Sequence, residues 1–338
     1  MKRVQNPPNP YESEHRDLLE PATEAQVEVF EDHSEGILSH NESPDLSFRW
    51  GINPYRGCFH SCIYCYARRT HEFLGFGAGT DFETKIVVKP RAPELLRAHF
   101  LKPSWKGELI LFSGVTDCYQ PLEAAYRLTR LCLEVCIEFQ NPVGVITKSY
   151  LVVRDIDVLK ELVRRAYTHV FLSIPFAEEE IARLIEPQAA HIERRFAAVE
   201  AMAKAGIPVG VSLAPIIPGL NDKDIPALLA RAKEAGATSA FYSILRLPGS
   251  VKDVFLTRLQ ERLPLRYRRV VNRIKEARQG RLYNPEFFER RRGHGPYWKS
   301  VDDMFRTTQK RLGLDRFPNV PEPSPFRRPE LQSEFVLS

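Results

Sequence analysis

Short apolar runs alternate with helical patterns along the middle of the chain, and this alternation constrains the fold more than any other feature. The runs are rich in β-branched and aromatic residues, as expected of strands buried on both faces. They cover residues 48–52, 109–112, 143–147, 170–174, 209–214 and 239–245. Helical patterns lie near residues 121–139, 155–167, 190–205 and 223–235. Strand and helix in regular order predict an α/β fold with a parallel sheet, and about six repeats are fewer than a complete eight-fold barrel needs.

Composition places the chain among globular proteins. Of its 338 residues, 43% are hydrophobic and 27% charged, which excludes wholesale disorder. No run approaches 18 apolar residues, so we expect no transmembrane helix and no membrane partner. The first twenty residues have no apolar stretch after their basic residues, unlike a secretory signal, and the expected location is cytoplasmic.

Changes in composition divide the chain into four parts. Residues 1–45 are rich in Pro, Glu, Asn and Ser and predict a flexible N-terminal arm. The alternating core covers residues 46–248. A helix-rich, basic C-terminal extension follows over residues 249–314, and we expect it to cover the open side of the partial barrel. Five prolines in residues 315–338 predict a flexible tail.

Three cysteines, Cys58, Cys62 and Cys65, lie within eight residues of one another just after the first apolar run. Six cysteines in 338 residues are too sparse for a disulfide scaffold, so the cluster favours a metal or redox site. A short loop can place three thiolates around one face of an iron–sulfur cluster and leave one iron open. A structural zinc site would need four ligands. His60 and His71 keep zinc open by residue type, although no second cysteine pair exists.

The spacing C-x3-C-x2-C, with an aromatic residue before the last cysteine, resembles the radical S-adenosylmethionine (radical SAM) superfamily over residues 48–247. The resemblance implies an α/β fold with an open (β/α)6 partial TIM barrel. It also implies a 4Fe-4S cluster on the three cysteines and SAM on the open iron. One electron then cleaves SAM to methionine and a 5′-deoxyadenosyl radical, which abstracts hydrogen from a substrate. A flavodoxin-like or ferredoxin-like electron donor would be a partner.

Within the superfamily, the chain resembles the spore photoproduct lyase-like branch. Tyr64 and Tyr66 flank Cys65, and the matching tyrosines of that branch line the SAM site. The resemblance further implies a radical relay through Tyr66. Lys148 and Ser173, at the ends of the third and fourth strands, match residues that contact SAM.

Two further strand ends fit the resemblance, the first to this branch and the second to the superfamily as a whole. Ala214, before Pro215 in the fifth strand, matches a residue beside the adenine. Ser113 and Gly114 follow the second strand, where the superfamily has a glycine-rich turn beside the SAM amino group; an ordinary β–α turn would explain them equally well. Arg246 ends the sixth strand, where a cation suits an anionic substrate or the SAM carboxylate.

One departure concerns the cysteine that returns hydrogen to the product radical in spore photoproduct lyase. Gly114 stands at the matching position, and Cys118 follows a few residues later. Cys118 is therefore a candidate catalytic hydrogen donor, with a plain buried thiol as the commoner explanation. Asp117 and Glu123 are weaker catalytic candidates. Cys132 and Cys136, four apart on an apolar helix, are expected in the core.

Charge is concentrated near the C-terminus. Residues 262–292 hold eleven Lys and Arg against three Glu, whereas the whole chain has a net charge of only +5. This block, interleaved with aromatic residues, suggests a nucleic acid or another phosphate-bearing substrate. Two alternatives stay open: the same chemistry on a peptide or small metabolite, and a non-catalytic iron–sulfur or zinc protein.

Overall fold

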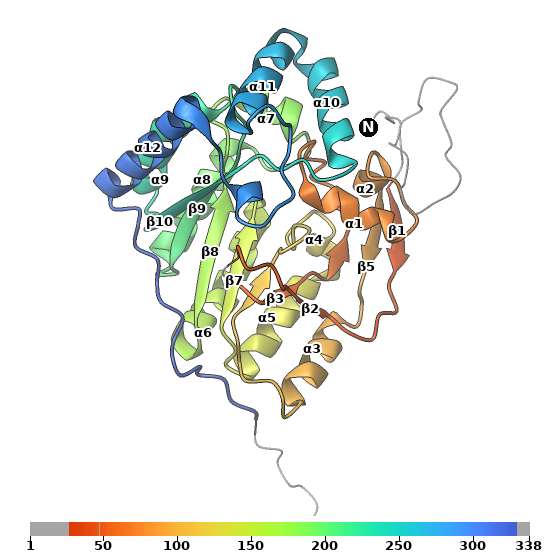
Figure 1. The fold of residues 1–338 in the computed structure, drawn as a ribbon. Helices are drawn as coiled ribbons and strands as arrows, with labels where there is room; N and C mark the ends of the chain where they lie inside the picture. The colour runs from red at the N-terminus through yellow and green to blue at the C-terminus, as the bar shows by residue number, and fades with distance from the viewer. Residues whose placement is uncertain (1–26, 47, 330–338) are drawn as a thin grey trace, which may run out of the picture.

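The computed structural model describes residues 27–46 and 48–329, and a seven-stranded sheet forms its centre (Figure 1). The strands follow the order β10-β9-β8-β7-β6-β3-β2. Neighbouring strands from β3 to β10 pair in parallel, whereas β2 pairs antiparallel with β3. The bounds are β2 (Leu38–His40), β3 (Trp50–Ile52), β6 (Ile110–Phe112), β7 (Val143–Thr147), β8 (Thr168–Ser173), β9 (Val209–Ile216) and β10 (Ser239–Ile244). This parallel-rich sheet confirms the predicted α/β class and is consistent with a partial barrel.

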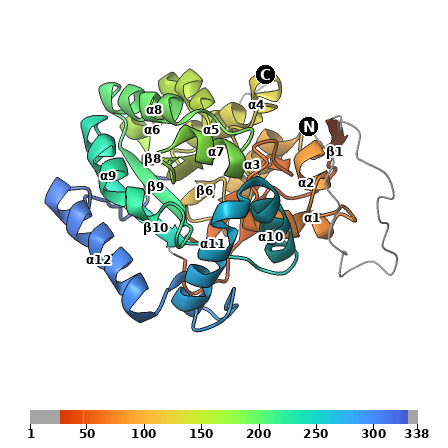
Figure 2. The same ribbon diagram turned by 90° about the horizontal axis from the view of Figure 1, so that it is seen from above.

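Helices follow the strands and pack around the outer side of the sheet, as the view from above shows (Figure 2). Their bounds are α3 (Ala92–Leu101), α4 (Glu123–Tyr126), α5 (Leu128–Glu138), α6 (Ile156–Arg165), α7 (Glu179–Ile185), α8 (Ile192–Lys204) and α9 (Ile225–Glu234). The short 3-10 helices η2 (Tyr150–Asp155) and η3 (Asp222–Asp224) precede α6 and α9. Gly206 and Gly236 end α8 and α9 with positive φ angles of 74° and 93°, as their sequence context predicts.

The helix expected over residues 121–139 is interrupted. Arg127 adopts the left-handed conformation, with φ 54°, and separates α4 from α5. The buried carboxylate of Glu123 accepts the backbone N–H groups of Thr129, at 2.9 Å, and Arg130, at 3.3 Å. It thereby satisfies donors that the first turn of α5 cannot pair internally.

A second, three-stranded sheet has the order β1-β5-β4 and comprises β1 (Glu28–Glu31), β4 (Tyr55–Arg56) and β5 (Lys85–Val88). The strand β1 pairs in parallel with β5, and β2 joins the main sheet. The prediction of a flexible arm over residues 1–45 is therefore wrong for 28–31 and 38–40. Backbone pairing holds β1, whose side chains are all exposed, so apolar periodicity carried no signal for it. Residues 1–26 lie outside the described residues.

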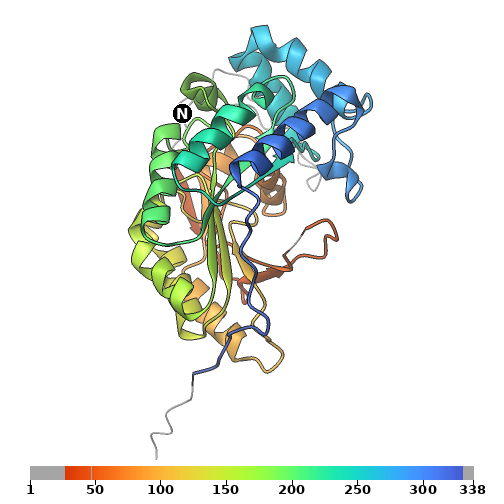
Figure 3. The same cartoon turned by 90° about the vertical axis from the view of Figure 1, so that its left-hand side faces the viewer.

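The C-terminal extension is helical, as predicted, and comprises α10 (Val251–Arg262), α11 (Pro264–Ala277), η4 (Glu289–Arg291) and α12 (Gly295–Leu312). The helix α12 packs on α9, and the chain then runs back along the sheet (Figure 3). The described part of the predicted flexible tail, residues 315–329, is docked instead. Phe326 packs on Phe100 and Phe139, and Ser324 Oγ donates to Gly107 O at 2.6 Å. Residues 330–338 lie outside the described residues.

Within the described ranges, every helix is too short or too polar to span a lipid bilayer.

Candidate active site

The three clustered cysteines lie on a loop between β4 and the 3-10 helix η1 (Tyr66–Arg68), which is followed by α1 (Arg69–Glu72) and α2 (Asp81–Thr84). Backbone bonds fix the loop: Cys58 N donates to Phe82 O at 2.9 Å, and Cys65 N donates to Cys62 O at 3.3 Å. The thiols of Cys58 and Cys62 are buried, and that of Cys65 is partly exposed. The loop thus presents three thiols from one short, well-ordered segment.

The thiols lie close enough to influence one another. Burial, with a further contribution from Cys58, raises the pKa of Cys65 to about 11. Burial and the neighbouring Glu186 raise the pKa of Cys62 well above its usual range. Within residues 27–46 and 48–329, no three His, Cys, Asp or Glu side chains converge as ligands of a single ion. A structural zinc ion takes four ligands at one centre, whereas a cubane takes each thiolate on a different iron.

A buried arginine holds this loop, and sequence reasoning missed it. Arg68 Nε donates to Cys62 O at 2.9 Å, and its two Nη atoms donate to three more backbone carbonyls. Glu83 forms ion pairs with both Arg68 and Arg258 of α10. Burial alone would raise the pKa of Glu83, but the two guanidinium groups outweigh it and hold this pKa below its usual value. No local pattern in the sequence links these three positions.

One group of predicted SAM contacts gathers around Tyr64. Lys148 Nζ, at the end of β7, donates to Ser173 Oγ at 2.7 Å. Ser173 Oγ in turn donates to Ala214 O at 3.2 Å, and the ammonium lies 5.8 Å from the centre of the Tyr64 ring. Adjacent parallel strands bring their carboxyl ends to one edge, so residues from four separate segments meet here.

The buried carboxylate of Glu186 anchors this group. It accepts the hydroxyl of Tyr64, pairs with Arg195 at 2.6 Å, and lies 3.7 Å from Lys148 Nζ. Arg194, which precedes Arg195 in α8, instead lies over the ring of Tyr150. The tyrosine contact had no sequence signal.

A second group gathers around Tyr66, on the other side of Cys65. Its hydroxyl donates to Gly114 O at 2.7 Å, and the guanidinium of Arg246 lies 5.4 Å from its ring centre. Ser113 has a positive φ of 71°, which turns the chain sharply after β6. Its hydroxyl accepts the N–H of Cys118 at 2.8 Å. Tyr66 is 43% exposed, so this group borders solvent.

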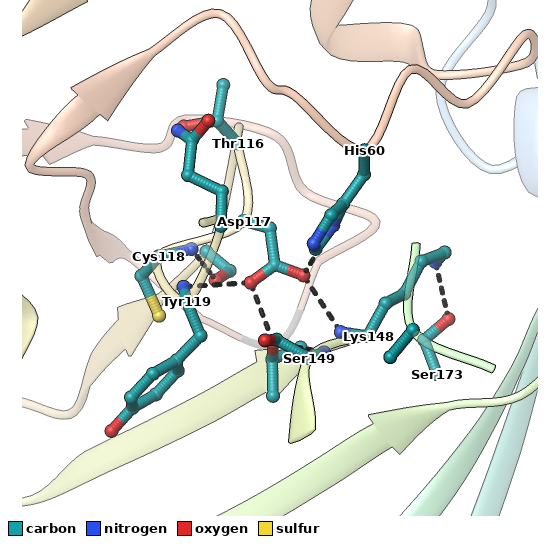
Figure 4. Close-up of polar contacts among 12 residues, drawn as sticks. His60, Thr116, Asp117, Cys118, Tyr119, Lys148, Ser149 and Ser173 are labelled. Carbon is teal, nitrogen blue, oxygen red and sulfur yellow. Dashed lines mark hydrogen bonds and ion pairs between the residues drawn. The ribbon is translucent and has the colours of Figure 1, made fainter. Parts of the chain in front are cut away.

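Asp117 ties the group around Tyr64 to the cysteine loop through Lys148 and His60 (Figure 4). Its carboxylate accepts Thr147 Oγ1 at 2.7 Å and Lys148 N at 2.8 Å, and it lies 3.4 Å from His60 Nδ1. Burial would raise the pKa of Asp117, but His60 and the hydrogen bonds lower it to about 2. An ionised, fully bonded carboxylate of this kind positions loops. His60, a candidate zinc ligand by residue type, serves as its partner.

The remaining cysteines belong to the core. Cys118 is 1% exposed, and burial raises its pKa well above the usual range. Cys132 and Cys136 are fully buried in α5, which confirms their expected place. Cys118 lies beside Ser113 but packs in the same apolar cluster as the other two.

Sequence relatives share this core. The uncharacterized protein Rv2578c of Mycobacterium tuberculosis is 35% identical over 233 residues, which cover 68% of each chain. The uncharacterized protein MJ0683 of Methanocaldococcus jannaschii is 33% identical over 174 residues, covering 52% of this chain and 62% of that relative.

A solved structure shares this fold, and a family model identifies the superfamily. Spore photoproduct lyase complexed with dinucleoside spore photoproduct has the same fold: the TM-score is 0.58 at 17% identity, covering 84% of this chain and 78% of that one. The radical SAM superfamily model matches residues 52–232, from β3 to α9, and includes the cysteine loop and both groups of predicted SAM contacts up to Ala214. The chain therefore belongs to the radical SAM superfamily, whose enzymes use a 4Fe-4S cluster and SAM.

Proposed function

We propose that this enzyme binds a 4Fe-4S cluster through Cys58, Cys62 and Cys65 and directs SAM chemistry at a phosphate-bearing substrate, with nucleic acid as the leading case. The observation that carries the proposal is the meeting of separate strand ends beside the cysteine loop. Lys148, Ser173 and Ala214 are joined there by successive hydrogen bonds of 2.7 and 3.2 Å. We further propose that the parallel strands form the open (β/α)6 barrel typical of the superfamily.

The residues of this site have distinct tasks. Lys148 provides a cation, while Ser173 and Ala214 provide polar atoms for SAM beside Tyr64. Glu186, paired with Arg195, holds Tyr64 and Lys148 in place. When bound, the cluster and SAM supply one-electron cleavage of SAM and hydrogen abstraction from the substrate. A flavodoxin-like or ferredoxin-like protein would deliver the electron.

Tyr66 is the stronger of the two catalytic candidates. It follows the last cysteine, is partly exposed, and touches the turn after β6. Its position suits a group that passes hydrogen between the cofactor site and the substrate. Cys118 is almost fully buried and surrounded by apolar neighbours, which favours a structural thiol over a hydrogen donor.

Formation of 5′-deoxyadenosine tests the proposal. The full chain is reconstituted anaerobically with iron and sulfide, reduced with dithionite and mixed with SAM, and the product is detected by mass spectrometry. We expect product from the wild type and none from a Cys58→Ala, Cys62→Ala, Cys65→Ala triple variant. Cys136→Ala removes a thiol outside the loop and serves as the matched control. A wild-type protein with a full cluster and bound SAM that forms no product, with or without nucleic acid, contradicts the proposal.

Basic residues of η3 and α11 support a phosphate-bearing substrate. Lys223, Arg266 and Arg269 line a cavity of about 200 Å³ beside Gly219. Two acids face them: Glu178 lies 2.6 Å from Lys223 and 3.9 Å from Arg266, and Asp224 lies 4.0 Å from Lys223. The similar structure of spore photoproduct lyase contains a dinucleoside photoproduct.

Binding to a short single-stranded oligonucleotide at increasing salt tests the nucleic-acid part. Every contact between a basic side chain and a phosphate contributes to the slope of log affinity against log salt. Arg269→Gln should therefore reduce that slope by about 0.7 on a single strand. Absence of binding at low salt would favour a peptide or small metabolite as the substrate.

A further inference from the structure

Four arginines converge where the C-terminal extension meets the end of β10. Arg246 follows β10, Arg278 follows α11, and Arg290 and Arg291 lie in η4. Arg278 Nη atoms donate to the carbonyls of Leu245, Glu289, Arg290 and Arg292 at 2.7–2.9 Å. Arg278 thereby fastens the η4 segment to the end of β10 and brings these cations together.

Acidic partners for this arginine cluster are scarce. Asp45 binds Arg290 through both oxygens, while Arg291 reaches only the backbone carbonyl of Asp45. Glu289 is occupied by His294 at 2.7 Å. Among the described residues, neither Arg246 nor Arg278 pairs with a carboxylate, and the Nε atoms of both are buried without a hydrogen-bond partner. Arg278 is buried but bonded to four carbonyls, whereas Arg246 is partly buried without a counter-charge in the described part of the chain. A cation that loses water without gaining a counter-charge is costly and favours an anion from elsewhere.

Two of these arginines, Arg246 and Arg291, lie beside Tyr66. The guanidinium of Arg246 lies 5.4 Å from the centre of the tyrosine ring, and Arg291 lies close enough to Tyr66 and to Arg246 to interact electrostatically with both. Burial lowers the pKa of Arg291; the Asp45 carboxylate opposes this effect, and the nearby Arg246 adds to it. The two guanidinium groups therefore share one electrostatic environment at the partly exposed side of the active site.

We propose that Arg246 and Arg291 form a binding site for an oxyanion of the substrate, a phosphate group, next to Tyr66. One guanidinium group binds two phosphate oxygens through two parallel N–H donors. A phosphate group has enough oxygens and negative charge to bind two guanidinium groups. This inference rests on the proposed function and assigns the atoms that would hold the substrate near the reacting centre. The SAM carboxylate is the other possible source of an oxyanion, but Lys148 already provides a cation on the Tyr64 side.

Binding of inorganic phosphate tests this site without turnover. Calorimetric titration of the reconstituted full chain compares the wild type with Arg246→Gln and Arg291→Gln, and separate titrations measure SAM. We expect phosphate affinity to fall about tenfold or more in each variant, because a charge-assisted bond is removed. SAM affinity should fall much less. Arg246→Lys, which keeps the charge but lacks the paired donors, should lie between wild type and Arg246→Gln.

Control variants separate this site from other basic surfaces. Arg164→Gln removes an exposed arginine of α6 and should leave phosphate affinity unchanged, and unfolding curves check that each variant is folded. The proposal is overturned if wild type binds no phosphate, if Arg269→Gln alone abolishes binding, or if SAM affinity falls as much as phosphate affinity. The protein could bind phosphate in a way that depends on Arg246 and yet fail to cleave SAM. That result would contradict the proposed function but support this phosphate site.

Discussion

The six cysteines differ in burial, and burial decides what each thiol can do. Cys65 is partly exposed, whereas Cys118, Cys132 and Cys136 are at most 1% exposed. A buried thiol is screened from reagents, and burial also disfavours its reactive thiolate. Residue type and spacing therefore identify the ligand candidates, and among these burial distinguishes Cys65 from Cys58 and Cys62.

The rate at which a maleimide alkylates each cysteine should reflect the burial of its thiol. In the cluster-free, folded chain we expect a maleimide to modify Cys65 first and to leave Cys118, Cys132 and Cys136 unmodified. All six should react after denaturation. Peptide mass spectrometry over time establishes the order. Fast labelling of Cys118 in the folded chain would show that it is accessible and would restore it as a hydrogen-donor candidate.

At the scale of elements, the central strands pack so closely that a single methyl group matters. Gly210 lies in β9 between β8 and β10. A Cβ there would approach Ser239 Oγ to 2.3 Å and Phe171 Cε1 to 2.5 Å. The sheet therefore requires glycine at this position.

Gly210→Ala should lower the free energy of unfolding by about 1–3 kcal/mol, because overpacking forces neighbouring strands to shift. Urea denaturation measures the change. Gly36→Ala is the matched control: a methyl group added there would meet no atom within 4 Å, and the effect should stay within about 0.5 kcal/mol. Equal effects at both positions would contradict the close packing around β9.

The ion pairs of Glu83 connect α2, the cysteine loop and α10. Glu83→Gln leaves Arg68 and Arg258 buried without their shared counter-charge, so we expect the free energy of unfolding to fall by about 3–5 kcal/mol. Urea denaturation measures this change as well. The exposed pair of Lys299 and Asp303 provides a control, and Asp303→Asn should cost less than about 1 kcal/mol.

The same substitution should change the pH dependence of stability. The folded state lowers the pKa of Glu83 below its usual 4.5, so its stabilisation is present above about pH 4.5 and is lost as the pH falls below that value. Glu83→Gln should therefore flatten the acid limb of the stability curve. An unchanged slope between wild type and variant below pH 4.5 would show that Glu83 is not ionised in this site.

At the scale of the whole molecule, segments near the two ends of the chain contact each other. Asp45, in the connection from β2 to β3, pairs with Arg290 across 245 residues and accepts the N–H of Phe288. This contact holds the η4 segment, and with it Arg291, over the Tyr66 side of the active site. The N-terminal connection and the C-terminal extension thus form one unit.

Asp45→Asn should loosen that unit, because the amide cannot replace the paired charge. We expect faster amide hydrogen exchange and faster proteolysis over residues 286–292, with little change in β7 or β8. Asp303→Asn, in an exposed pair of α12, should leave the exchange of this segment as in wild type. Unchanged protection in Asp45→Asn would show that other contacts hold the segment.

Local patterns in the sequence were sufficient to predict the parallel-rich sheet and the cysteine loop. Strands such as β7, whose bounds match the prediction, are continuous apolar runs, and apolar burial is a local property of sequence. The cysteine spacing is visible in the sequence, and Lys148, Ser173 and Ala214 each follow or end a recognisable apolar run. Their contact with SAM is implied by the family resemblance and stays a prediction. Turn signals at Gly206 and Gly236 likewise depend on local backbone conformation.

Which distant groups meet could be learned only from the folded chain. The strands β1 and β2 are held by backbone pairing, which leaves no apolar pattern, and the docked tail depends on aromatic partners at and just beyond the ends of α3 and α5. Glu186 beside Tyr64, and Arg246 beside Arg291, are pairs of residues far apart along the chain. Ion pairs and hydrogen bonds of this kind depend on distance in space. The sequence shows which residues are charged but does not show which charged residues will lie close together after folding.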